Sequence, residues 1–195
     1  MNLELYFAPG ACSFVPHVAL EAVKAATGQA FEPKLVKLHK GEHRTPEYLA
    51  MNPNGQVPVL VVDGKPLTQI VVICDYLDRS FPKAGLLPTE PWARAQALSQ
   101  LAWMNNTAHP TFTHVFRAAD FAASEAAQAD VRKVAAEKFC RYLERIQDWV
   151  AGANPYWYGE RVTCHDAYAS RCCAGAATRA STPSRCRPML PTSSA

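Results

Sequence analysis

A cysteine followed by a serine is the pair of residues best placed to do chemistry in this chain. Cys12 and Ser13 follow an apolar run that stops at Pro9 and Gly10, and they precede a helical pattern. Unpaired backbone amides and the helix dipole favour an anion at such a start, so the pattern predicts a thiol that ionises more easily than an ordinary one. Cys12 is then a candidate nucleophile and disulfide-forming group, and the Ser13 hydroxyl a candidate donor to a ligand's sulfur. The alternative is that Cys12 only fills a small apolar gap.

A loop between residues 52 and 58 is the second candidate. It contains Asn52, Gly55 and Pro58, which are turn residues. Because proline restricts the residue before it, Val57 is expected to have an extended backbone. If the sheet leaves its amide and carbonyl unpaired, Val57 is able to bind the backbone of a peptide-like ligand. An ordinary turn proline is the alternative.

A small mixed α/β unit is expected to position these residues. Alternating or compact apolar runs predict strands at 3–7, 31–38 and 59–62. Asp63-Gly64 predicts a hairpin turn into an edge strand that tolerates Pro66.

Three helices are predicted between these strands. Apolar residues at helical spacing run from Ser13 to a capping glycine at Gly28, and Thr45-Pro46 predicts the start of a short helix. A third helix is predicted from Ile70. The resulting order is βαβ, a short helix, ββ and α.

The rest of the chain is predicted to be helical. The composition between Phe81 and Pro91 is typical of a linker, so we expect a first domain at 1–81 and a linker at 82–91. Long helical patterns at 92–116 and 126–150 predict an all-helical second domain over 92–169.

This order of elements, together with three motifs, resembles the bacterial beta-type branch of the glutathione transferase family. Tyr6 to Ser13 resembles its first turn, Asn52 to Pro58 its glutathione-binding loop, and Val162-Thr163 with Asp166-Ala167 its second-domain capping motif. The resemblance covers residues 1–169. It implies a thioredoxin-like α/β domain followed by an all-α domain.

The resemblance also implies that glutathione is the co-substrate, and it assigns residues to each part of that molecule. Gln56, Val57 and Pro58 would hold the cysteinyl backbone, with a cis peptide bond before Pro58. Lys40 corresponds to a lysine near the glycyl carboxylate, although most surface lysines are merely solvated.

The resemblance also assigns roles to two further pairs of residues. Gln69 and Ile70 would meet the γ-glutamyl carboxylate at a helix start. Ile70 departs from the Ser, Thr or Gly that the family usually has there, and a simple helix-cap role for Gln69 is the alternative. Asn105 and His109 would lie near the thiol, and a structural histidine is the alternative for His109.

The function implied is that of an enzyme that activates the thiol of glutathione for attack on hydrophobic electrophiles, as in detoxification, with Cys12-dependent disulfide exchange as a further activity. The family resemblance also implies a homodimer. A non-catalytic interaction protein on the same fold and an inactive truncated product are the alternatives.

Composition argues against several other classes of protein. The net charge is +3, and no run of basic residues lines a predicted helix, which argues against nucleic acid as a partner. We see no signal peptide and no apolar run of the roughly 18 residues that span a bilayer, so a cytoplasmic protein is expected. The cysteines lack zinc-ligand spacing, so no metal is expected, and their distribution favours a reducing compartment.

The composition changes abruptly after Ala169. Residues 170–195 are rich in Arg, Ser, Cys and Pro and contain no acidic residue, and no amphipathic helix is predicted through them. We therefore expect an aberrant or disordered tail there. Our hypothesis is a shift of the reading frame near residues 164–170, and a native disordered tail is the alternative.

Overall fold

A four-stranded mixed sheet forms the first half of the chain in this computed structural model, which describes residues 1–177. The strands are β1 (Leu3–Phe7), β2 (Glu32–Leu35), β3 (Val59–Val62) and β4 (Lys65–Thr68). Their order is β2-β1-β3-β4, with β1 parallel to β2 and antiparallel to β3. The β3–β4 hairpin turns at Asp63 and Gly64, which both have positive φ, as the sequence predicted.

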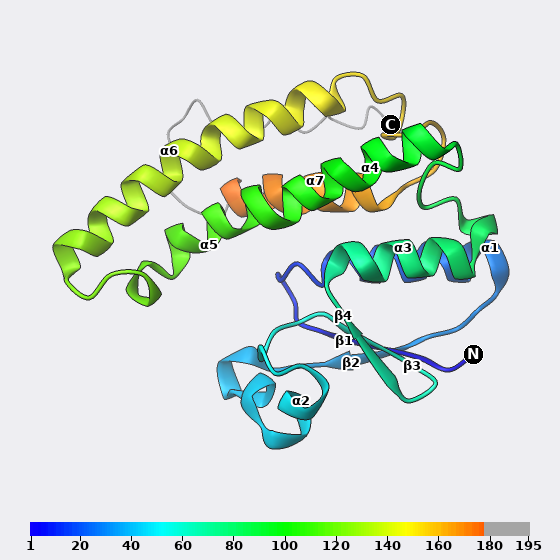
Figure 1. The fold of residues 1–195 in the computed structure, drawn as a ribbon, viewed down its shortest axis with the longest axis horizontal. Coiled ribbons are helices and arrows are strands. Elements are labelled where there is room, and N and C mark those ends of the chain that lie inside the picture. Colours follow the sequence, from blue (N-terminus) through cyan, green and yellow to red (C-terminus); the bar gives the residue numbers. More distant parts are fainter. Residues whose placement is uncertain (178–195) are drawn as a thin grey trace.

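Alternating side chains give the sheet two apolar faces. Leu3, Leu5 and Leu60 lie on one face and pack into the main core with two helices, α1 (Phe14–Thr27) and α3 (Ile70–Ser80). Val59 and Val61 lie on the other face, in a smaller cluster that includes Tyr48 of α2 (Pro46–Met51). The first half is therefore a sheet between helices, and Figure 1 shows α1 and α3 between it and the rest of the chain.

The second predicted strand is shorter than the sequence suggested. It ends at Leu35 rather than Leu38, and the amide of Val36 makes a last hydrogen bond of 2.8 Å to the carbonyl of Phe7. Because β1 ends at Phe7, the chain has no further strand to pair with. It continues into two short 3-10 helices, η1 (Leu38–Lys40) and η2 (Glu42–Arg44).

The second half consists of helices, as predicted. They are α4 (Pro91–Trp103), the π-helix η4 (Met104–Ala108), α5 (His109–Phe116), the short η5 (Ala118–Asp120), α6 (Glu125–Val150) and α7 (Cys164–Ala177). The fold is thus a thioredoxin-like α/β unit followed by an all-helical unit. None of the helices between residues 1 and 177 is long and apolar enough to cross a bilayer.

The helical pattern predicted over 92–116 is interrupted by the π-helix. Pro110 lacks the N–H that an α-helix would direct to the carbonyl of Asn106, and its ring would collide with that carbonyl. A wider π turn just before the proline accommodates both effects.

The segment predicted as a linker is packed rather than exposed. Ala84 in η3 (Pro82–Ala84), Leu86 and Leu87 are buried in the main core. The buried carboxylate of Asp78 accepts a hydrogen bond from the amide of Leu87 at 3.0 Å. It also forms an ion pair with Arg94 at 2.6 Å. These contacts fix α3 against the start of α4.

Helix α7 extends beyond the point where the sequence predicted helical structure to end. It runs to Ala177 and packs against α1, α4 and α6, with Tyr168, Cys172 and Cys173 buried. The expectation of no helix after residue 169 is wrong for 170–177, because the thiols of Cys172 and Cys173 are buried as apolar groups, which composition alone did not indicate. The remainder of the predicted tail, 178–195, lies outside the described residues.

His165 of α7 is buried beside the carbonyl of Ala97, with its Nε2 at 2.9 Å from that oxygen and 3.4 Å from the Tyr158 hydroxyl. Its Nδ1 has no hydrogen-bond partner among the described residues. Burial lowers the pKa of His165 from 6.5 to about 4, against opposing effects of the Ala97 carbonyl and of Asp166. The folded protein therefore holds this imidazole neutral.

We predict that this histidine makes the fold acid-sensitive. Below pH 6.5 the unfolded chain binds a proton at His165 that the folded chain does not bind until about pH 4. The free energy of unfolding should therefore fall by about 3 kcal/mol between neutral pH and pH 4 from this group alone. Urea titrations of the wild type and His165→Gln over this range measure the effect.

The exposed His39→Gln variant is the control, since it removes an imidazole without touching the core. A His165→Gln variant as acid-sensitive as the wild type would contradict the prediction.

Candidate functional site

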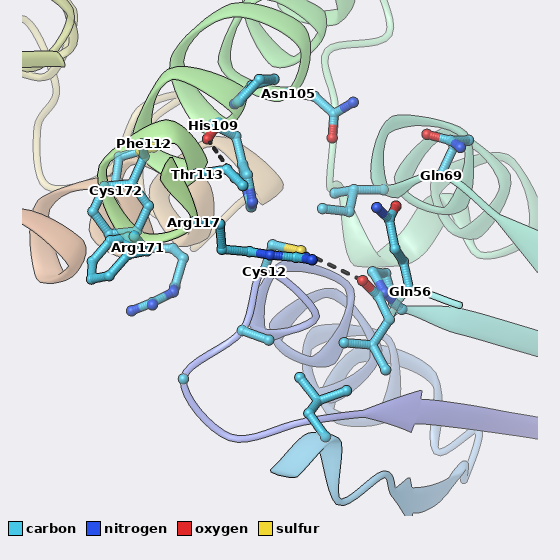
Figure 2. Close-up of a pocket in the computed structure, with 18 of the residues that line it drawn as sticks. Cys12, Gln56, Gln69, Asn105, His109, Phe112, Thr113, Arg117, Arg171 and Cys172 are labelled. Atoms are coloured by element: carbon cyan, nitrogen blue, oxygen red, sulfur yellow. Dashed lines mark hydrogen bonds between the residues drawn. The ribbon is translucent and has the colours of Figure 1, made fainter. Parts of the chain in front are cut away.

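A cavity of about 560 Å³ lies between the sheet unit and the helices. It is lined from one side by the start of α1, the loop before β3 and the start of α3, and from the other by residues of η4, α5, α6 and α7. Figure 2 shows Asn105 and His109 above Cys12, and Gln56 and Gln69 toward its right. Eight of the ten predicted site residues line the cavity; they are Cys12, Gln56, Val57, Pro58, Gln69, Ile70, Asn105 and His109.

Cys12 lines the cavity as predicted, but its thiol is harder to ionise than the sequence suggested. Its Sγ donates a hydrogen bond of 3.6 Å to the carbonyl oxygen of Val57. Burial raises the pKa of Cys12 from 9.0 to about 11, and it outweighs the nearby backbone amides and the Arg171 guanidinium, which lower it. The structure does not support the prediction of an easily ionised thiol, because desolvation exceeds the effect of the helix start.

Ser13 lies outside the cavity, contrary to expectation. Its side chain is fully buried, and its hydroxyl accepts a hydrogen bond from the amide of Ala8 at 3.1 Å and donates one to the carbonyl of Ala8 at 3.2 Å. The hydroxyl is occupied in bracing the turn after β1. Ser13 thus positions Cys12 and is not available to a ligand.

The loop before β3 is held by side chains of α2 and of the loop itself. The carbonyl of Gln56 accepts hydrogen bonds from the Asn52 amide at 2.7 Å and from the Tyr48 hydroxyl at 2.9 Å. Gly55 has a φ of +58°, and a Cβ there would lie 3.0 Å from the carbonyl oxygen of His43, so only glycine fits without a shift.

The Val57-Pro58 peptide bond is cis, as the resemblance implied. The β1–β3 ladder begins at Val59, and the amide of Val57 makes no hydrogen bond to any residue of the described chain. A backbone donor beside the Cys12 sulfur is therefore available to a ligand.

The start of α3 forms the next part of this wall. Gln69 precedes the helix with a φ of 72° and is exposed, whereas Ile70 is buried and belongs mostly to the core. Positive φ in a residue other than glycine is a strained conformation that is frequent at functional sites. It turns the chain so that Gln69 and the first free amides of an eleven-residue helix face the cavity.

Lys40 is not brought to the site. It ends η1, is exposed and does not line the cavity, because the chain leaves the sheet earlier than predicted. His43 of η2 lines the cavity instead, and its buried Nδ1 has no hydrogen-bond partner among residues 1–177.

The helical wall carries a hydrogen-bonded cluster around the Tyr168 hydroxyl. That hydroxyl donates to Oδ1 of Asn105 at 3.1 Å and lies 3.3 Å from Nδ1 of His109. Burial, followed by the charge of Arg171, lowers the pKa of His109. His109 is therefore neutral at physiological pH, and its imidazole extends toward Cys12 in Figure 2.

Sequence reasoning missed three cavity residues on α7, namely Tyr168, Arg171 and Cys172. Their spacing of three and four residues places them on one face of a helix. The signal was present, because Asp166 caps this helix by accepting hydrogen bonds from the amide and hydroxyl of Thr163 at 2.8 and 2.6 Å. The unusual composition that follows hid it.

Among the described side chains, no group of three or more His, Cys, Asp or Glu is arranged to hold a metal ion. Cys12, Cys74, Cys164, Cys172 and Cys173 are free thiols. The chemistry visible at the cavity is therefore that of a thiol site next to a residue whose backbone amide has no partner in the described chain, as in a thioredoxin-like thiol-binding protein.

Comparison with known proteins identifies the family. Residues 1–79 match the family model for the glutathione S-transferase N-terminal domain. The chain is 32% identical over 171 residues to glutathione S-transferase GstA of Escherichia coli O157:H7, covering 85% of this chain and 78% of that protein. It therefore belongs to the glutathione S-transferase family, as its motifs predicted.

The solved structures agree. A glutathione transferase homologue from Sulfitobacter with bound glutathione superposes with a TM-score of 0.78 at 31% identity, covering 89% of this chain and 81% of that one.

Protein LigF of a Sphingobium species is 39% identical over 108 residues, but the match spans only 40% of its length.

We predict from the raised pKa that Cys12 alkylates slowly at neutral pH. The rate of iodoacetamide modification at Cys12, followed by peptide mass, should rise about tenfold per pH unit from pH 7 to 10, because the thiolate fraction grows in that proportion below a pKa of about 11. The Cys12→Ser variant assigns the signal. A rate that levels off below pH 8 would show an activated thiol instead.

Proposed function

We propose that this protein is a glutathione transferase that binds glutathione along the wall formed by residues 56–58 and 69–70 and transfers its thiol to an electrophile held against the helical wall. The observation that carries the proposal is that the amide of Val57 has no partner in the described chain, while the carbonyl of the same residue accepts from the Cys12 thiol, at a cis Val57-Pro58 bond inside the cavity. A family relative with glutathione bound supports the choice of ligand.

Glutathione fits the polar groups of this wall. The cysteinyl backbone of glutathione would pair with the amide of Val57 in the manner of a short strand. The γ-glutamyl carboxylate would meet the free amides at the start of α3 and the side chain of Gln69, where the helix dipole favours an anion. The substitution of Ile70 for the family's usual hydroxyl or glycine leaves this contact to backbone amides and Gln69.

His109 is suited to accept the proton of the glutathione thiol. When its Nδ1 donates to the Tyr168 hydroxyl, its Nε2 carries the lone pair, and its lowered pKa keeps it neutral. The thiolate then attacks an electrophilic carbon, a carbon–sulfur bond forms and the leaving group departs with the bonding electrons. Asn105, oriented by Tyr168, supplies an amide near the developing charge.

The other parts of the proposal follow the family. We propose a hydrophobic electrophile as second substrate, a role in detoxification, a cytoplasmic location and a homodimer in which the sheet unit of one subunit packs on the helices of the other. A non-catalytic interaction protein on this fold would not need the free amide of Val57 or a neutral His109 beside the thiol.

We predict that glutathione binding depends on Gln69 and not on Lys40. Gln69→Ala should weaken glutathione binding about tenfold, because a polar contact to a carboxylate is lost at the cavity. Lys40→Ala should change it less than twofold, because Lys40 lies outside the cavity. Isothermal titration calorimetry of the full chain measures both, with Lys40→Ala as the matched control.

Equal losses in the two variants would contradict this assignment of the wall. If the folded wild-type chain does not bind glutathione at all, the enzyme proposal fails and the interaction protein takes its place.

One observation favours a second activity, since the Cys12 sulfur itself lines the cavity. In thiol–disulfide exchange, the Cys12 thiolate attacks glutathione disulfide, forms a mixed disulfide and releases one glutathione thiolate, which takes up the proton that Cys12 lost.

We predict that this exchange is slow at pH 7 and accelerates with pH, since the pKa of Cys12 is about 11. Intact mass after incubation with glutathione disulfide measures the adduct. The Cys12→Ala variant should form none while retaining glutathione affinity. An adduct that persists in Cys12→Ala would assign the exchange to another thiol.

A further inference from the structure

Two arginines line the helical side of the cavity, and they differ in their partners. Arg117, at the end of α5, forms an ion pair of 2.5 Å with Asp120 and is largely exposed. Arg171, on α7, forms no hydrogen bond or ion pair with any residue of the described chain and is partly buried. A guanidinium held at a cavity wall without a counter-ion is costly unless something else supplies the negative charge.

The described part of the cavity lining provides no such counter-ion. It contains two arginines and no aspartate or glutamate. Because Asp120 pairs with Arg117, Arg171 is the arginine of the two whose charge has no partner among residues 1–177. The field of Arg171 extends to the thiol site, since its charge contributes to lowering the pKa of both Cys12 and His109.

Aromatic rings line the same cavity as this charge. The ring of Phe112 lies 4.2 Å from that of Phe116 and 4.9 Å from that of Phe139, centroid to centroid, and all three residues line the cavity. Figure 2 shows Arg171 and Phe112 on the same side of Cys12, away from Gln56 and Gln69. A flat apolar group fits against such rings.

We propose that the second substrate is an aromatic electrophile that carries a carboxylate, with the ring held by the phenylalanines and the carboxylate by Arg171. This inference deepens the proposed function and rests on it. Arg171 suits the role because its planar guanidinium binds a carboxylate through two parallel hydrogen bonds. The wall of Gln56 and Gln69 would hold glutathione, so the γ-glutamyl carboxylate and the carboxylate of the second substrate would lie on different sides of the cavity.

A halogenated nitrobenzoate illustrates the chemistry. The glutathione sulfur attacks the ring carbon that bears the halogen, a carbon–sulfur bond forms and halide leaves, while the thiol proton passes to His109 and then to water. The carboxylate takes no part in bond making, and Arg171 is therefore a specificity-determining residue.

Binding is tested first with ligands that do not react. Calorimetry compares dinitrobenzoate with dinitrobenzene on the full chain, on Arg171→Gln and on Arg132→Gln. Arg132 lies exposed on α6 outside the cavity, so its variant removes the same charge elsewhere. We expect the wild type and Arg132→Gln to prefer dinitrobenzoate about tenfold, and Arg171→Gln to lose that preference.

Turnover is tested with a chlorodinitrobenzoate and the neutral chlorodinitrobenzene in the presence of glutathione. Arg171→Gln should lower kcat/KM about tenfold for the carboxylate substrate and less than twofold for the neutral one. Equal losses for both substrates, a loss of glutathione affinity in Arg171→Gln, or a preference for dinitrobenzoate that survives this variant would each overturn the proposal.

The two proposals fail in distinguishable ways. If the chain does not bind glutathione and does not turn over either substrate, the enzyme proposal is refuted. The calorimetric preference for dinitrobenzoate still decides whether Arg171 selects an anionic aromatic ligand.

Discussion

The carboxylate of Asp166 fixes the start of α7, and the arrangement of the cavity depends on that helix. Asp166 accepts hydrogen bonds from the amide and hydroxyl of Thr163 and from the amide of Trp157 at 2.9 Å. The helix that begins there packs directly on α1, whose first turn carries Cys12. Tyr168 and Arg171 thereby come to line the same cavity as Cys12, so a local cap determines the composition of the distant wall.

The same packing sets the chemistry of the thiol. The start of α1 offers backbone amides that favour a thiolate, yet the neighbouring helices remove water from Cys12, and the second effect is larger. A thiol with a raised pKa that donates to the Val57 carbonyl is mostly protonated at neutral pH. Low intrinsic reactivity in the free protein is compatible with transfer to electrophiles through the thiol of a bound substrate rather than through Cys12.

Local signals predicted much of the fold. Gly28 ends α1 with a φ of 76°, and Thr45 caps α2 by accepting a hydrogen bond from the amide of Tyr48. The site was predicted in part, since Cys12 and the 56–58 loop lie in short segments whose own chemistry identifies them. The predictions failed for Ser13, whose hydroxyl bonds to the turn, and for Lys40, whose position depended on where β2 leaves the sheet.

The sequence by itself determined the order of the elements, the turn at Asp63-Gly64 and the helix caps at Gly28 and Thr45, because each depends on residues within a few positions of one another. The thioredoxin-like unit and the cis bond before Pro58 followed from the resemblance to the family. The tertiary structure decided the direction of the Cys12 pKa, the role of Tyr168 and the isolation of Arg171. Each of these depends on which distant groups exclude water or supply charge, and desolvation and unpaired charge arise only when α7 packs against α1.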